Sequence, residues 1–125
     1  MPYARILCVD DDPRINELNQ VVLARSGYDV ATAESPSDAL NRLRTESFDL
    51  VITDLFPQSP QDSAFVANLR RLDPEMPVIL VTGNHNPPAE ILRQADAFVA
   101  KAYSLNALRE SVRDVLMRSK LRRIG

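Results

Sequence analysis

The chain is poor in glycine, and its acidic and basic residues nearly balance. Only three glycines occur among 125 residues, at positions 27, 83 and 125. The dinucleotide-binding fingerprint and the phosphate-binding loop each need several glycines at fixed spacing, so the sequence argues strongly against both kinds of nucleotide site. Fifteen basic and seventeen acidic residues give a net charge of −2. This balance argues against direct nucleic-acid binding, whose affinity depends on neutralising phosphates.

Long apolar runs and paired cysteines are also missing. No stretch approaches the roughly 20 apolar residues that span a bilayer, and the N-terminus lacks the pattern of a secretion signal. The single cysteine, Cys8, cannot form an internal disulfide and lies within an apolar run. We therefore expect a reduced, cytoplasmic protein without membrane contact, in which Cys8 fills the core.

What is present is the composition of one globular domain. Apolar residues make up 45% of the chain and charged residues 26%, which is typical of a folded soluble domain. A chain of this size buries roughly two-thirds of its unfolded surface, so it needs no stabilising disulfides or metal. No internal repeat divides the sequence. We expect a single domain over residues 1–125.

Short apolar runs alternate with longer amphipathic stretches along the chain. The short runs predict strands at residues 5–9, 28–33, 48–53, 77–82 and 96–101. The amphipathic stretches predict helices at residues 13–25, from Ser35-Pro36 onward, and at 62–72, 89–94 and 105–121. This alternation predicts an α/β fold in which helices cover both faces of a parallel sheet.

Helical spacing also predicts the inward side chains. In the first helix, these are Ile15, Leu18 and Val22, preceded by Asp12 as the helix N-cap. In the last helix, the inward side is predicted to carry Leu105, Leu108, Val112, Val115 and Leu116.

Polar residues follow the predicted strands. Asp10 and Asp11 come after the first strand and Asp54 after the third, while Thr82 and Lys101 end the fourth and fifth. In an open α/β sheet, the ligand site lies at the carboxyl edge where the strand order reverses. The flavodoxin-like order 2-1-3-4-5 makes the first and third strands neighbours, so the three aspartates are predicted to converge.

Three converging carboxylates indicate a cation site. Their mutual repulsion is relieved by a divalent cation, and oxygen ligands without histidine or cysteine favour Mg²⁺. A carboxylate beside such an ion can attack a phosphoryl donor and form an acyl phosphate. The Thr82 hydroxyl and the Lys101 ammonium are suited to bind the phosphoryl oxygens.

These motifs resemble the receiver domain of response regulators, the phosphoacceptor module of two-component signalling. The matching segments are ILCVDDDP, LVITDL, VILVTG and FVAKAY, which occur in order along the whole chain. The resemblance implies a flavodoxin-like (βα)5 three-layer sandwich with sheet order 2-1-3-4-5. The segment between Thr82 and Lys101 is shorter than usual in the family, and Pro87-Pro88 interrupt it. The fourth helix is therefore expected to be short or irregular.

The resemblance also assigns a Mg²⁺ site. It implies that Asp54 is the phosphorylation site and that Asp11 and Asp54 bind Mg²⁺ directly. Asp10 would act mainly through a metal-bound water, and the backbone carbonyl of Phe56 would be a further ligand.

The remaining family roles concern the phosphoryl group and the conformational switch. Thr82 would bind a phosphoryl oxygen and move on phosphorylation, and Lys101 would pair with the phosphoryl group. Phe98 occupies the position of the family's rotameric aromatic switch. Ala102 follows Lys101 where the family usually has a proline after a cis bond, so the geometry of this bond is not fixed by the resemblance.

The implied partner is a sensor histidine kinase or a histidine phosphotransfer protein. The resemblance leaves open a downstream output domain or protein and a homodimer as further partners. A receiver catalyses its own phosphorylation and dephosphorylation, so no turnover of a separate substrate is expected.

Two other functions remain open at this stage. One is a receiver-like protein-interaction scaffold that works without phosphorylation, although no member of the acid, acceptor, hydroxyl and lysine set is missing. The other is a haloacid-dehalogenase-type phosphatase with Asp10 as nucleophile and Asp12 as acid/base. Arg14 stands where such a phosphatase has a threonine.

The resemblance yields a prediction about the lifetime of the acyl phosphate. Phe56 and Asn84 occupy positions that modulate this lifetime in the family, and Phe56 is bulky and apolar where a smaller polar group could orient water. We therefore expect slow hydrolysis, measured as the loss of the phosphoryl adduct from the purified protein with time. A half-life of seconds would contradict this expectation.

Overall fold

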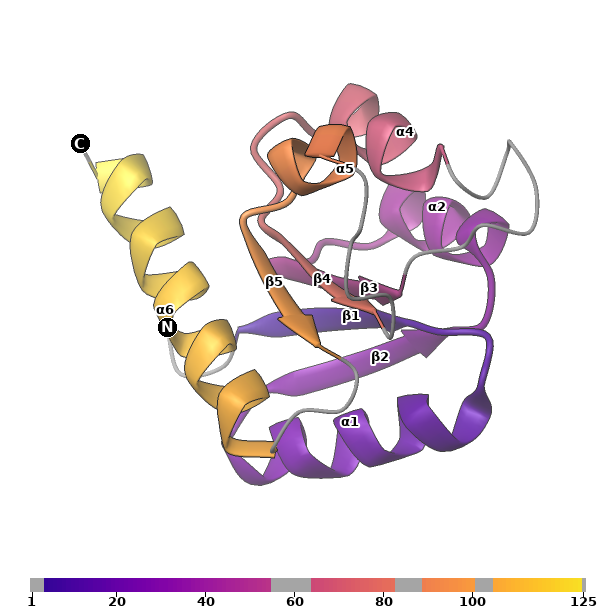
Figure 1. Ribbon diagram of the computed structural model, residues 1–125, viewed down its shortest axis with the longest axis vertical. Coiled ribbons are helices and arrows are strands. Elements are labelled where there is room, and N and C mark those ends of the chain that lie inside the picture. The colour runs from indigo at the N-terminus through magenta and orange to yellow at the C-terminus, as the bar shows by residue number, and fades with distance from the viewer. Residues whose placement is uncertain (1–3, 55–63, 83–88, 101–104, 125) are drawn as a thin grey trace.

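The fold is built on one parallel sheet of five strands, shown in a computed structural model (Figure 1). The structure describes residues 4–54, 64–82, 89–100 and 105–124, without the side chains of Thr82, residues 90–92 and residues 122–124. The strand order is β2-β1-β3-β4-β5. The strands are β1 (Arg5–Val9), β2 (Asp29–Ala33), β3 (Leu50–Asp54), β4 (Val78–Thr82) and β5 (Ala97–Ala100).

Helices cover both faces of this sheet. They are α1 (Pro13–Arg25), α2 (Pro36–Thr45), α4 (Phe65–Leu72), α5 (Ala89–Gln94) and α6 (Leu105–Ile124). Figure 1 shows α1 and α6 on one side of the sheet and α2, α4 and α5 on the other. The predicted three-layer flavodoxin-like sandwich is confirmed, including the short fourth helix, which is the six-residue α5. None of the helices among the described residues is long and apolar enough to cross a membrane.

Alternate side chains of each central strand enter two separate cores. From β1, Ile6 and Cys8 pack with Leu23 of α1 and the inner side of α6, whereas Leu7 and Val9 pack with α2 and α4. Both faces of the sheet are therefore buried, which explains why these strands appear as continuous apolar runs in the sequence. Burial raises the pKa of the Cys8 thiol to about 12, and the negative charge of Asp10 adds to this shift. Cys8 fills the core, as predicted.

The ends of α1 follow from local sequence. The Asp12 side chain accepts a hydrogen bond from the Arg14 N–H at 2.9 Å, and Pro13 occupies the first helical position. This confirms Asp12 as the N-cap. Gly27, with φ of 95°, follows the helix in the left-handed region that favours glycine.

The predicted inward face of α1 is partly wrong. Leu18 is 44% exposed, whereas Asn16 and Asn19 are buried together with Leu23. The reason is that α1 contacts the sheet through amide side chains as well as apolar ones. The Gln20 Nε2, for example, donates to the backbone oxygen of Val30 at 3.1 Å.

The last helix agrees better with its prediction. Leu108, Val112 and Val115 are buried, but Leu105 is 40% exposed, and the helix continues to Ile124 rather than ending at residue 121. The predicted start of the third helix at residue 62 lies outside the described residues, and α4 is helical from Phe65.

Arg70 of α4 joins several elements at the amino edge of the sheet. Its guanidinium donates to the Gln94 backbone oxygen at 2.8 Å and to the Asp96 Oδ2 at 3.0 Å, and it also reaches the Met76 backbone oxygen. The same Asp96 oxygen accepts from the Val78 N–H at 2.8 Å. Arg70 thus connects α4 with the end of α5 and the starts of β4 and β5.

We expect the substitution Arg70→Ala to lower the free energy of unfolding by about 2–4 kcal/mol, because it leaves a mostly buried carboxylate and several carbonyls without their cation. Urea unfolding followed by circular dichroism measures this loss. Arg71→Ala is the matched control, since Arg71 is the next residue of α4 and is exposed. Its effect should stay within about 0.5 kcal/mol. Equal losses in the two variants would contradict the role of Arg70.

Candidate functional site

The pairing of β1 with β3 brings the predicted aspartates together. Val9 is the register partner of Thr53, so Asp10, directly after β1, lies beside Asp54, the last residue of β3. Asp10, Asp11 and Asp54 each offer a carboxylate oxygen, and these oxygens lie within 4.8 Å of one another. The predicted convergence of the three aspartates is confirmed, and we call them the acidic cluster.

The three carboxylates differ in their access to solvent. Asp10 is only 4% exposed, Asp54 is half-buried and Asp11 is exposed. The Asp10 Oδ1 accepts the Asp12 N–H at 2.9 Å, and the Asp10 N–H donates to the Ala33 backbone oxygen at 3.1 Å. The buried Asp10 carboxylate is therefore held by a hydrogen bond within the protein, whereas the Asp11 carboxylate is accessible to solvent.

This arrangement can hold a divalent cation. Carboxylates this close repel one another, and a cation between them favours their ionised forms. The nearest sulfur in the sequence, Cys8, is buried and protonated, whereas a thiol must be deprotonated to bind a metal. The donor set is thus made of oxygens alone, which suits a hard cation.

Thr82 lies at the same edge as the cluster. Asp54 is the register partner of Val81 in β4, so the Thr82 backbone lies one residue beyond the level of Asp54. On its other side, Thr82 pairs with Ala100 of β5. The described part of the structure does not include the Thr82 side chain, nor does it include Phe56, Lys101 or the Lys101–Ala102 bond. Their predicted roles remain predictions.

Phe98 and Asp12 are also placed by the structure. Phe98 is the register partner of Leu80 and is 39% exposed, so it is not a buried core residue. Asp12 caps α1 and forms an ion pair with Arg14, with 3.1 Å between the Asp12 Oδ2 and the Arg14 Nη2. It contributes no ligand atom to the acidic cluster described above.

One polar residue beside the cluster was missed by the sequence analysis. Asn16 of α1 is 4% exposed, and its Nδ2 donates to the backbone oxygens of Asp10 and Ala33. The signal was the spacing of Asn16, Asn19 and Leu23 along one helical face. A search for apolar residues alone does not find such a face.

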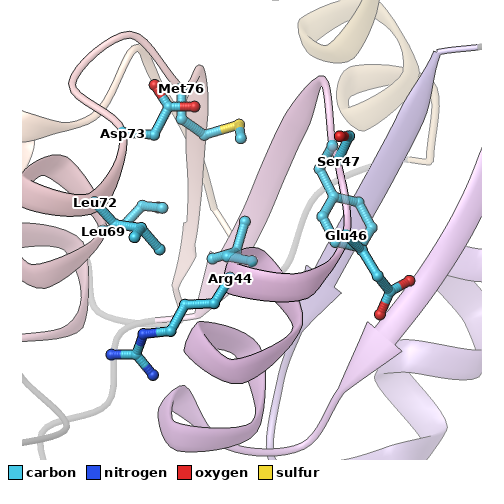
Figure 2. Close-up of a pocket in the computed structure, with 9 residues that line it drawn as sticks. Arg44, Glu46, Ser47, Leu69, Leu72, Asp73 and Met76 are labelled. Atoms are coloured by element: carbon cyan, nitrogen blue, oxygen red, sulfur yellow. The ribbon is translucent and has the colours of Figure 1, made fainter.

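A separate pocket of about 330 Å³ lies at the opposite edge, between α2 and α4 (Figure 2). Leu69 and Met76 line its apolar part, while Arg44 and Asp73 supply charges. Near this pocket, hydrogen bonds from Arg5 and then Arg42 lower the pKa of the Glu46 carboxyl. No member of the acidic cluster lines this pocket.

Comparison with known proteins gives a consistent result. The family model described as the response regulator receiver domain matches residues 6–113. The chain is 34% identical over 119 residues to the transcriptional regulatory protein GlrR of Escherichia coli, covering 93% of this chain and 27% of GlrR. It is 31% identical over 120 residues to the alkaline phosphatase synthesis transcriptional regulatory protein PhoP of Bacillus subtilis, covering 94% of this chain and 50% of PhoP.

Solved structures agree with these relatives. The response regulator TrrA of Thermotoga maritima, crystallised in complex with Mg²⁺-BeF, has a TM-score of 0.82 and 30% identity, covering 90% of this chain and 98% of TrrA. NtrX of Brucella abortus, crystallised with ATP, has a TM-score of 0.88 and 29% identity, covering 98% of this chain and 29% of NtrX. The chain therefore spans between about a quarter and a half of the curated relatives named here.

The cluster geometry generates a prediction about stability. Asp11→Asn should raise the free energy of unfolding of the metal-free protein by about 1 kcal/mol, the repulsion of two unit charges about 4 Å apart in water. The same substitution should remove most of the stabilisation produced by added MgCl2. Thermal and urea unfolding with EDTA or with MgCl2 measure both effects.

Asp114→Asn is the matched control, because Asp114 is an exposed aspartate of α6 outside the acidic cluster. It should leave the response to MgCl2 unchanged. Destabilisation of the metal-free protein by Asp11→Asn would show that repulsion within the cluster does not control its stability.

Proposed function

The chain belongs to the response regulator receiver domain family, and on this basis we propose that it accepts a phosphoryl group on Asp54 in a Mg²⁺-dependent reaction. The observation that carries the proposal is the acidic cluster at the carboxyl edge, where Asp10, Asp11 and Asp54 converge within 4.8 Å. The family match covers residues 6–113, and we treat residues 1–125 as one receiver domain.

In this proposal Asp11 and Asp54 bind Mg²⁺ directly, and Asp10 acts mainly through a metal-bound water. The backbone carbonyl of Phe56 completes the protein ligands. When bound, the ion neutralises the carboxylates and the charge that develops on the phosphoryl oxygens. The high burial of Asp10 and the exposure of Asp11 support this division between indirect and direct contact.

The reaction itself is carried by Asp54. A carboxylate oxygen of Asp54 attacks the phosphorus of a phosphohistidine, so that an O–P bond forms and the N–P bond of the donor breaks. The electron pair of that bond goes to the imidazole nitrogen, which remains with the donor. The Thr82 hydroxyl and the Lys101 ammonium bind the transferred oxygens. The chain then acts on its own Asp54 and has no separate turnover substrate.

Phosphorylation would bias an equilibrium between two conformations. Inverting a 1:99 population requires about 5.5 kcal/mol of preference for one state, to which charge-assisted contacts of Thr82 and Lys101 contribute. In this proposal Phe98 of β5 changes its rotamer when Thr82 moves, and the partial exposure of Phe98 supports such freedom.

The donor in this proposal is a sensor histidine kinase or a histidine phosphotransfer protein in the cytoplasm. The similarity to TrrA in its complex with Mg²⁺-BeF supports the Mg²⁺ requirement. The similar regulators GlrR and PhoP are much longer than this chain, which supports a downstream output domain or protein as the target. A homodimer is compatible with the same proposal.

The phosphatase alternative receives less support from the geometry. It would require Asp12 as a mobile acid/base, but Asp12 caps α1 and pairs with Arg14. A phosphorylation-independent scaffold keeps the same fold, so it is separated from the proposal only by the experiment below.

Intact-mass analysis after incubation with acetyl phosphate tests the proposed function. We expect a single phosphoryl adduct that requires Mg²⁺ and is lost in Asp54→Asn. Asp38→Asn is the matched control, because Asp38 is an exposed aspartate on α2, and it should be modified like the wild type.

Two other outcomes would contradict the proposal. No adduct on a folded protein, from either acetyl phosphate or a phosphorylated histidine phosphotransfer protein, would favour the scaffold. An adduct that persists in Asp54→Asn but disappears in Asp10→Asn would move the nucleophile to Asp10 and favour the phosphatase.

A further inference from the structure

Asn16 is a buried polar residue that no step of the proposed reaction uses. It lies in the first turns of α1 and is 4% exposed. Its Nδ2 donates to the backbone oxygens of Asp10 and Ala33, each at 3.0 Å. One side-chain amide therefore joins α1, the end of β2 and the loop that carries Asp10 and Asp11.

The contact with Asp10 controls the position of the next residue. The Asp10 carbonyl belongs to the planar peptide unit that also contains the Asp11 nitrogen and Cα. An amide that fixes the direction of this carbonyl therefore fixes where the chain of Asp11 begins. The Asp10 N–H is held by Ala33 and its carboxylate by the Asp12 N–H, so Asn16 supplies the contact to the remaining polar group of Asp10.

Hydrogen bonds within the described residues satisfy only the donor side of the Asn16 amide. The Asn16 Oδ1 is buried and has no hydrogen-bond partner among the described residues. A buried acceptor without a partner opposes folding, and such groups in native structures require an explanation. Leucine has a similar volume and would avoid this cost, but it could not donate to the Asp10 carbonyl.

We propose that Asn16 is a positioning residue for the acidic cluster: its amide orients the Asp10–Asp11 peptide so that both carboxylates converge with Asp54 on Mg²⁺. Asn16 itself does not bind the ion. The inference rests on the proposed function and adds to it a residue that acts through the backbone of a metal ligand. Such supporting contacts around a metal site commonly change affinity by about 10–100-fold.

The test compares Asn16→Leu with Asn19→Leu. Asn19 has the same 4% exposure and lies about one turn further along α1, so the two substitutions make the same chemical change at equal burial. Isothermal titration with MgCl2 should show a Kd raised about tenfold or more in Asn16→Leu and a Kd close to the wild-type value in Asn19→Leu.

A kinetic measurement separates positioning from a general loss of structure. In phosphorylation by acetyl phosphate, Asn16→Leu should require more Mg²⁺ for half-maximal rate, while its rate at saturating Mg²⁺ should approach that of the wild type. Amide hydrogen exchange should also become faster at Asp12, whose N–H bonds the Asp10 carboxylate. Asn16→Ala replaces Asn16→Leu, with the same expectations, if the leucine variant does not fold.

The outcomes distinguish this inference from the proposed function. A wild type that binds Mg²⁺ and is phosphorylated, together with an unchanged Mg²⁺ Kd in folded Asn16→Leu, overturns only the role of Asn16. Equal weakening in Asn16→Leu and Asn19→Leu also overturns it, because the effect would then follow from α1 packing in general. A wild type that shows neither Mg²⁺ binding nor an adduct overturns the proposed function and this inference together.

Discussion

The site depends on one constraint, the parallel register of β1 and β3. Because Val9 lies opposite Thr53, the residue that follows β1 and the residue that ends β3 are both carboxylates at the same height. A shift of one residue in this register would place Asp54 beside Val9 and turn its side chain to the other face of the sheet. The cluster is therefore a consequence of strand pairing, and the buried runs of both strands hold that pairing in place.

Charges are distributed differently at the two edges of the sheet. At the amino edge, acidic side chains are paired with arginine: Arg5 contacts Asp29 and Glu46, and Arg70 contacts Asp96. At the carboxyl edge, the acidic cluster brings like charges together. One edge of the sheet is thus stabilised by opposite charges, whereas the other concentrates negative charge where a cation and a phosphoryl group can bind.

Much of this arrangement could be predicted from the sequence because it depends on short-range patterns. Apolar runs bounded by turn residues gave all five strands, and Pro13 after Asp12 marked the start of α1. The convergence of Asp10, Asp11 and Asp54 followed from the topology, since carboxyl ends of parallel strands share one edge. Predicting these features requires only the spacing of apolar residues along the chain and the rule that parallel strands need crossover connections.

The inward face of α1 was less predictable, because its contacts are made by amides. Asn16 and Gln20 donate to backbone oxygens of neighbouring segments. The spacing of apolar residues in the sequence does not indicate such hydrogen bonds. The exposure of Leu18 is the corollary: once the amides face the sheet, this side chain must point away. Hydrogen bonds between a helix and the carbonyls at a sheet edge depend on tertiary geometry, and a sequence pattern does not contain that information.

The amide side chains of α1 and the carboxylates of the acidic cluster are structurally linked. Helix α1 begins shortly after Asp10 and Asp11 and therefore packs close to the loop that bears them, and that loop has backbone oxygens to satisfy. An apolar side chain in place of Asn16 would leave the Asp10 oxygen without the amide donor that it has here, whereas asparagine donates to the oxygens of both Asp10 and Ala33. The amide of Asn16 on the inner face of α1 thus gives the buried Asp10 a partner for its carbonyl oxygen, while Asp11, one residue later, is open to solvent.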